Sequence, residues 1–166
     1  MRWALLVSLF LVPSAVRAEV PIPLDCRVHN QPRERCAWCA LETLARYHQI
    51  DELYDLAQKH SEAASIADLE SALDEVNINY RVQDPGPRDV AILRYAVREK
   101  LGAVVGFREA KPGAGRHMVT LVDYGPNAVR VIDSNDADGR VRTMPLKRFL
   151  SWWDGFALVI EPESEQ

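Results

Sequence analysis

The sequence has few cysteines, little excess charge and no long apolar run. Three of its 166 residues are cysteine, and the formal net charge is −4. An acidic balance argues against nucleic acids and anionic membranes as partners, because both bind basic surfaces. The spacing of cysteine and histidine fits no zinc site, and no pattern in the chain calls for a cofactor. No internal repeat is present, so we expect one domain with one hydrophobic core.

Residues 1–18 have the pattern of a secretory signal peptide. A basic residue precedes an apolar stretch from Ala4 to Val12, and the small residue Ala18 ends the segment. The apolar stretch is too short to span a bilayer as a helix. We therefore expect cleavage after Ala18, export to the periplasm or the cell exterior, and a single mature domain over residues 19–166.

The three cysteines are an odd number in a chain that we expect to be exported. They are Cys26, Cys36 and Cys39. An oxidising compartment favours a disulfide, and one disulfide among three cysteines leaves one thiol free. The remaining thiol is either a bystander or the reactive group.

The apolar spacing divides the chain into a helical first part and a strand-rich second part. Helical periodicity predicts helices over 36–49, 51–60, 65–76 and 88–101, with a short strand at 77–82. Ser65 and Asp68 have the spacing of a capping box. After Gly102 the period becomes two, which predicts strands at 103–107, 117–124, 129–133 and 156–160, interrupted by a short helix at 145–153. We expect an α+β fold in which a helical half packs on an antiparallel sheet.

The segment 31–48 carries the most informative pattern. Cys36 opens the first predicted helix, where unpaired backbone N–H groups and the helix dipole favour an anion such as a thiolate. A lowered thiol pKa is what a nucleophilic cysteine needs. Gln31, a few residues earlier, is placed to donate its side-chain amide to a developing oxyanion.

A histidine and an aspartate frame the next two predicted strands. His117 begins one strand after a glycine-containing loop, and Asp133 ends the following strand. If these strands pair through the turn at 125–127, both residues lie about six to eight positions from the turn, so their side chains meet. An aspartate there orients an imidazole, and Cys, His, Asp is one order of the nucleophile, base and orienting group. We expect the site in the cleft between helix and sheet.

Taken together, these motifs resemble the papain-like cysteine peptidases. The motifs are Gln-x₄-Cys-x-x-Cys-Ala-Leu, His-Met-Val-Thr-Leu-Val-Asp-Tyr and Val-Arg-Val-Ile-Asp-Ser. The most similar branch contains the bacteriocin-processing peptidase domains that cut after double-glycine leaders. The resemblance implies that Cys36 is the nucleophile, His117 the base, Asp133 its orienting group and Gln31 the oxyanion donor, with a peptide or protein as substrate. Two departures are the shorter spacing before Cys36 and Ala37 where the family commonly has glycine.

The resemblance leaves a second assignment of the nucleophile open. Papain-type enzymes use the second cysteine of Cys-x-x-Cys and hold the first in a disulfide, which would make Cys39 catalytic and pair Cys36 with Cys26. We favour Cys36, because starting the helix at Cys39 would turn the acidic Glu42 into the packing face. With Cys36 as the first helical residue, Cys39 lies one turn along the helix, where it pairs with Cys26 or is simply buried. Trp38 is a candidate for the wall of the substrate cleft, and a packing role fits it equally well.

Three other functions are compatible with these residues. The same triad serves acyl transfer or deamidation, since an amine can replace water as acceptor. A Cys-x-x-Cys at a helix start, here Cys36 and Cys39, also occurs in thiol-disulfide oxidoreductases, although polar residues precede it where a thioredoxin-like fold has a buried strand. A non-catalytic binding module with the same fold is the third. The pattern as a whole favours a secreted cysteine peptidase that cleaves peptide bonds.

Overall fold

The structure is a computed structural model, and it describes residues 19–30, 34–86, 88–108 and 116–162. Its helices, including two short 3-10 turns, are η1 (Leu24–Cys26), α1 (Cys36–Tyr47), η2 (Asp51–Leu53), α2 (Leu56–Lys59), α3 (Ile66–Glu75), α4 (Ala91–Arg98) and α5 (Leu146–Trp152). Its strands are β1 (Asn79–Gln83), β2 (Ala103–Phe107), β3 (His117–Tyr124), β4 (Ala128–Ile132), β5 (Val141–Pro145) and β6 (Trp153–Glu161). The predicted signal peptide and Gln31 lie outside the described residues.

The helices form where the apolar spacing predicts them, but most are shorter than their patterns. The helix α1 begins at Cys36, as expected. The N–H and hydroxyl of Ser65 donate to the Asp68 carboxylate, and the Asp68 N–H donates to the Ser65 hydroxyl, so the predicted capping box of α3 is confirmed. The segment 51–60 divides into η2 and α2 at Asp55, whose φ of 63° is left-handed. Among the described residues no helix has the length and apolar character needed to cross a membrane.

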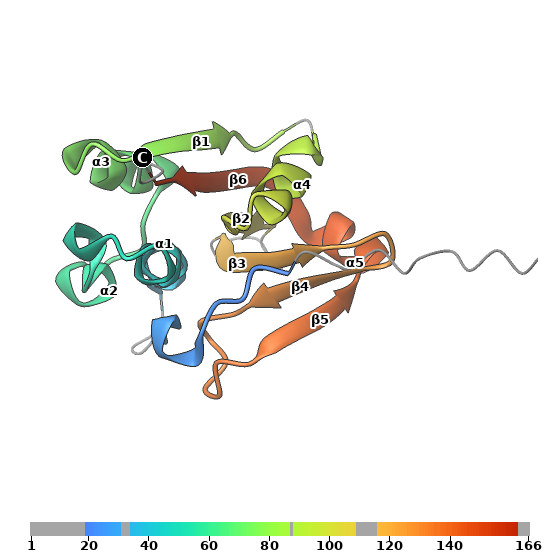
Figure 1. Cartoon of the computed structure of the whole chain (residues 1–166), viewed down its shortest axis with the longest axis horizontal. Coiled ribbons are helices and arrows are strands. Elements are labelled where there is room, and N and C mark those ends of the chain that lie inside the picture. The colour runs from blue at the N-terminus through green and yellow to red at the C-terminus, as the bar shows by residue number, and fades with distance from the viewer. Residues whose placement is uncertain (1–18, 31–33, 87, 109–115, 163–166) are drawn as a thin grey trace, which may run out of the picture.

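The six strands of the described ranges form one antiparallel sheet, which confirms the α+β fold. Their order is β1-β6-β2-β3-β4-β5, and every neighbouring pair is antiparallel. The last strand, β6, therefore lies between β1 and β2 rather than at an edge (Figure 1). Strand β5 was not predicted, because this edge strand is mostly exposed and lacks apolar alternation.

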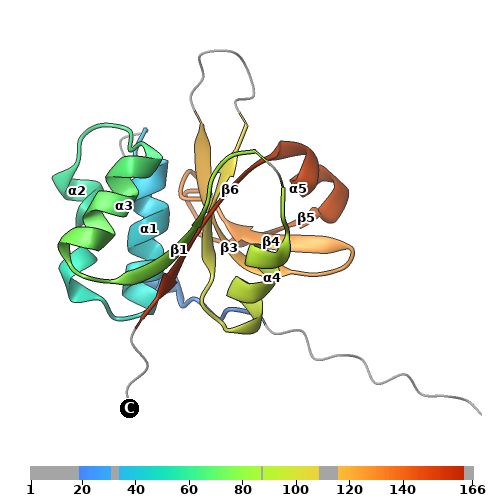
Figure 2. The same cartoon turned by 90° about the horizontal axis from the view of Figure 1, so that it is seen from above.

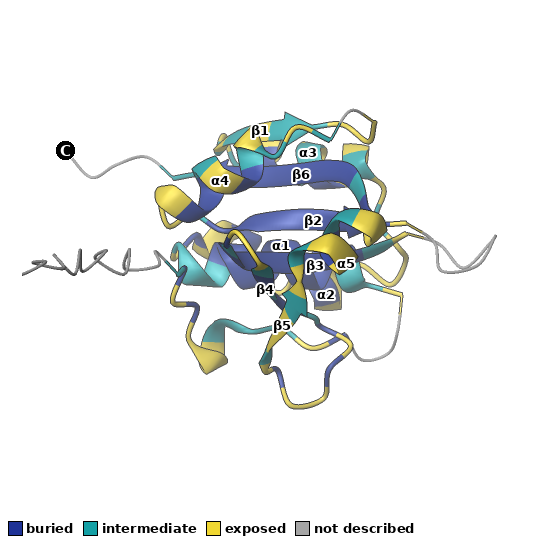
Figure 3. Ribbon diagram, turned by 90° about the vertical axis from the view of Figure 1, so that its right-hand side faces the viewer, coloured by how far each residue is buried: buried dark blue, intermediate teal, exposed yellow. Residues whose placement is uncertain are grey.

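Helices cover both faces of the sheet. The helices α1, α2 and α3 lie on one side, and α4 and α5 lie on the other (Figure 1, Figure 2). Although α4 belongs to the helical first part of the sequence, its buried stripe packs on β2, β3 and β6. Strands β2 and β6 are buried along nearly their whole length (Figure 3). Burial on both faces explains why β2 and the segment 156–160 of β6 are continuously apolar.

A buried acid on α1 contradicts one argument made from the sequence. The side chain of Glu42 is only 2% exposed, although the packing face of α1 was expected to exclude it. Its carboxylate accepts hydrogen bonds from Arg46 Nε and from the backbone N of Ala57, both at 2.9 Å. These partners offset the cost of removing the charge from water. The position of Glu42 therefore does not discriminate between Cys36 and Cys39 as nucleophile, and the surroundings of the two sulfurs must do so.

Candidate active site

The sulfur of Cys36 lies between the start of α1 and the start of β3. The backbone N of Met118 donates to Cys36 Sγ at 3.5 Å, and the thiol faces the carbonyl oxygen of Arg116 at 3.9 Å. The side chain of His117, the residue between them, hydrogen-bonds to the same sulfur. Three successive residues therefore surround an atom that also sits at the positive end of a 12-residue helix.

The imidazole of His117 is held from its other side by Asp133. The distance from His117 Nε2 to Asp133 Oδ1 is 2.9 Å, and the two side chains are 28% and 22% exposed. The same carboxylate oxygen accepts a hydrogen bond from the backbone N of Asn135 at 3.0 Å. Since Nε2 is engaged, Nδ1 is the ring nitrogen available to Cys36. The pairing of β3 with β4 thus brings His117 and Asp133 together, and the packing of α1 on β3 adds Cys36.

The titration of these three groups is mutually perturbed. Burial would raise the pKa of the Cys36 thiol, but hydrogen bonds from His117 and Met118 outweigh it and hold that pKa below its ordinary value. Burial would lower the pKa of His117, but the hydrogen bonds with Asp133 and Cys36 raise it to about 10. Burial also opposes ionisation of Asp133, yet the contact with His117 holds its pKa below the usual range. These directions favour a thiolate beside an imidazolium.

The residue Asn30, which the sequence analysis missed, joins the segment before α1 to the turn after Asp133. It is 4% exposed, and its Nδ2 donates to Asn135 Oδ1 at 2.8 Å. Its Oδ1 accepts from the backbone N of Arg35 at 2.9 Å, and its own N–H donates to the carbonyl of Ser134 at 2.9 Å. These bonds fix the start of α1 relative to the aspartate. An asparagine in a polar segment gives no signal of such a role in the sequence.

The other two cysteines are placed differently from Cys36. Cys39 is fully buried, and burial raises the pKa of its thiol to about 12. A thiol of this kind is a poor nucleophile near neutral pH. Cys26, Cys36 and Cys39 are all free thiols. Neither the candidate disulfide between Cys26 and Cys39 nor a Cys36–Cys39 redox bridge is therefore formed in this structure.

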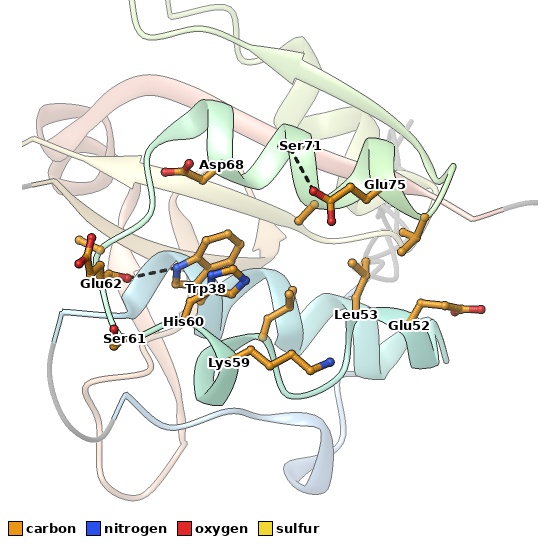
Figure 4. Close-up of a pocket in the computed structure, with 14 residues that line it drawn as sticks. Trp38, Glu52, Leu53, Lys59, His60, Ser61, Glu62, Asp68, Ser71 and Glu75 are labelled. Carbon is orange, nitrogen blue, oxygen red and sulfur yellow. Dashed lines mark hydrogen bonds between the residues drawn. The ribbon is translucent and has the colours of Figure 1, made fainter.

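Trp38 lies on the other side of α1 from Cys36, since two residues turn an α-helix through about 200°. Its Nε1 donates to the carbonyl oxygen of Glu62 at 3.2 Å, and its ring stacks on His60 with centroids 4.1 Å apart. The two rings border a pocket of about 540 Å³ between α1, α2 and α3 (Figure 4). Cys36 is not among the described residues that line this pocket. The structure thus places Trp38 at a separate pocket.

Comparison with known proteins shows the family to which the chain belongs. The family model of the Peptidase C39 family matches residues 27–165, a range that includes Cys36, His117 and Asp133. The chain belongs to the Peptidase C39 family. No curated protein matches the sequence of this C39 chain.

Solved structures of similar fold are peptidase domains. A double glycine motif protease from an AMS/PCAT transporter, solved with its leader peptide, has a TM-score of 0.63 at 13% identity, over 90% of this chain and 96% of that chain. The peptidase domain of Streptococcus ComA, a bifunctional ABC transporter, has a TM-score of 0.62 at 18% identity, over 82% and 97%. That of Streptococcus mutans ComA has a TM-score of 0.55 at 18% identity, over 82% and 99%.

These findings confirm the resemblance that the sequence motifs suggested. The likeness to the solved structures shows the fold, and membership of the C39 family makes this chain a cysteine peptidase of the papain-like type. Within its described residues, no group of three or more His, Cys, Asp or Glu side chains could hold a metal ion.

Proposed function

We propose that this C39 peptidase cleaves peptide bonds with Cys36 as nucleophile, His117 as general base and Asp133 as the group that orients the imidazole. The observation that supports this most strongly is the continuous line of contacts from the carboxylate through the imidazole to the sulfur. It includes the 2.9 Å distance from His117 Nε2 to Asp133 Oδ1. Because Nε2 is bound to the carboxylate, the ring keeps Nδ1 directed at the sulfur.

In the active form the proton of the Cys36 thiol has already passed to His117, which leaves a thiolate beside an imidazolium. The thiolate attacks the carbonyl carbon of the substrate, a C–S bond forms, and the electron pair of the C=O bond moves to oxygen. Backbone N–H groups at the start of α1 and the predicted oxyanion donor Gln31 stabilise that oxyanion. When the C–N bond breaks, His117 gives its proton to the leaving amine. Water, deprotonated by His117, then hydrolyses the thioester and restores the thiol.

We further propose a peptide or protein substrate and an exported location. Family membership supports a peptide substrate, and the similar protease from the AMS/PCAT transporter was solved with its leader peptide bound. Cys36 is half-buried, so the residue retains some access to solvent. The signal-peptide pattern of residues 1–18 supports export.

The proposal is tested by peptide cleavage with two matched cysteine variants. The wild type, Cys36→Ala and Cys39→Ala are each incubated with a defined peptide pool, and new termini are identified by mass spectrometry. We expect cleavage by the wild type and by Cys39→Ala, and none by Cys36→Ala, because only the sulfur of Cys36 contacts His117. Cleavage that survives in Cys36→Ala overturns the assignment. Incorporation of an added amine in place of water would instead identify acyl transfer on the same residues.

A further inference from the structure

An ion pair lies beside the proposed catalytic residues and joins two strands that are not neighbours. The Nε of Arg116 is 2.6 Å from Asp154 Oδ2. Arg116 directly precedes His117 at the start of β3, whereas Asp154 belongs to β6, and β2 lies between these strands. The Asp154 side chain is only 10% exposed. A carboxylate that is nearly buried needs a partner, and this guanidinium supplies it.

The sheet is interrupted at the point where the two charges meet. Val105 of β2 opposes Ala157 of β6, but Phe107 opposes Trp153, so β6 carries extra residues between these pairs. Asp154 lies in this bulge. A β-bulge bends a strand and re-aims the side chains that it contains. Here it directs a carboxylate from β6 across β2.

Two glycines make this arrangement possible. A Cβ at Gly106 would lie 2.8 Å from Asp154 Oδ1 and 3.2 Å from Arg116 Cδ, so any larger residue would occupy the space of the ion pair. Gly155, in the bulge, has a φ of +104°, and a Cβ there would lie 2.8 Å from the backbone N of Gly86. The bulge is also closed by a hydrogen bond from the N–H of Phe156 to Asp154 Oδ1 at 2.8 Å. Asp154 is thus held rigidly.

The ion pair acts on the same short segment that surrounds the nucleophile. The carbonyl of Arg116, the imidazole of His117 and the N–H of Met118 are contacts of the Cys36 sulfur. We propose that Asp154 is a positioning residue of the active site, which through Arg116 holds residues 116–118 around the sulfur. This inference rests on the proposed function of Cys36. It adds a side chain from β6 to the residues that support the reaction.

The test measures how fast iodoacetamide alkylates Cys36 as a function of pH in the full chain, with the modified peptide quantified by mass spectrometry. The variants are Asp154→Asn, which leaves an unpaired cation, and Arg116→Gln, which leaves an unpaired anion. A direct charge effect would move the thiol pKa in opposite directions in the two variants. Loss of positioning would raise the thiol pKa of Cys36 in both variants, because each substitution releases the contacts that stabilise the thiolate. Arg81→Gln, which breaks the Arg81–Glu161 pair between β1 and β6, is the matched control.

We expect Asp154→Asn and Arg116→Gln each to raise the midpoint of the alkylation profile by about one pH unit or more, which slows alkylation about tenfold at any pH below the wild-type midpoint. Gly106→Ala keeps both charges but crowds the ion pair, and the same loss is expected. Thermal melting establishes that the variants are folded. Opposite shifts, or a wild-type profile in all folded variants, overturn the inference. An ordinary thiol profile in the wild type overturns the proposed function, and the inference with it.

Discussion

The substitution Asp133→Asn tests the proposed triad most directly. It keeps the size of the side chain and removes the charge that faces His117 Nε2 at 2.9 Å. It also replaces one acceptor oxygen by an NH₂ group, so the ring loses its preference for presenting Nδ1 to Cys36. We therefore expect both the charge balance and the orientation of the imidazole to change.

The magnitude follows from the perturbed pKa of His117. Burial lowers this pKa, but the hydrogen bond to Asp133 leads the contributions that raise it, from 6.5 to about 10. Each pKa unit corresponds to about 1.4 kcal/mol. Because the side chain is 28% exposed, solvent reduces the effect, and we expect the folded protein to stabilise the imidazolium by about 3 kcal/mol. This stabilisation is complete below the pKa that His117 has in the unfolded chain, and it is lost as the pH rises through about 10, its pKa in the folded protein. Without the carboxylate charge, the pKa of His117 should fall by about 2 units.

The assay is the pH dependence of kcat/KM for a cleaved peptide. The active thiolate–imidazolium pair exists between the pKa of Cys36 and that of His117, so the alkaline limb of the profile reports His117. In Asp133→Asn we expect this limb to move down by about two pH units, with a loss in kcat/KM of about twofold at pH 8 that grows to the order of a hundredfold above pH 10. Asp138→Asn, at an exposed acid that pairs with Arg140, should leave the profile unchanged. An alkaline limb that stays in place in Asp133→Asn would refute the reasoning.

Three further substitutions test the framework that holds the site. Glu42→Ala removes the partner of Arg46 and of the Ala57 N–H, and should lower the free energy of unfolding by about 2 kcal/mol in urea titrations; an unchanged midpoint would contradict the buried contacts. Ser65→Ala removes the capping box of α3 and should cost about 1 kcal/mol by the same measurement while peptide cleavage is retained. Gly155→Ala introduces a Cβ at a left-handed position against Gly86 and should lower stability by roughly 2 kcal/mol, measured as a fall in Tm; a wild-type Tm would show that the bulge adapts.

Much of the candidate site could be predicted because it depends on local patterns. A cysteine at a helix start is visible in the apolar spacing that follows it, and α1 indeed begins at Cys36. His117 and Asp133 could be brought together because His117 opens β3 and Asp133 directly follows β4, and a short turn joins these two strands. Their meeting requires only the alternation of a strand and one antiparallel pairing, both of which the sequence displays.

The remaining features depend on contacts between distant segments, which local spacing does not encode. The placement of β6 between β1 and β2 follows from the sheet as a whole. Glu42 looked too polar to be buried, because its partner at Ala57 comes from another helix. Asn30 and Asp154 carry no pattern of their own, and their roles follow from the turn and the bulge that they reach. The oxyanion role of Gln31 and the signal peptide stay predictions.

The position of the last strand has a consequence for how the protein acquires its shape. Strand β1 has no neighbour in the sheet other than β6, and β2 has β6 along one of its two edges. A growing polypeptide that has not yet reached residue 153 therefore leaves β1 unpaired and one edge of β2 open. Because such long-range pairings form slowly, the complete sheet forms only after residues 153–161 have been made. A protease made this way cannot attack its surroundings from its final scaffold until β6 has emerged and paired.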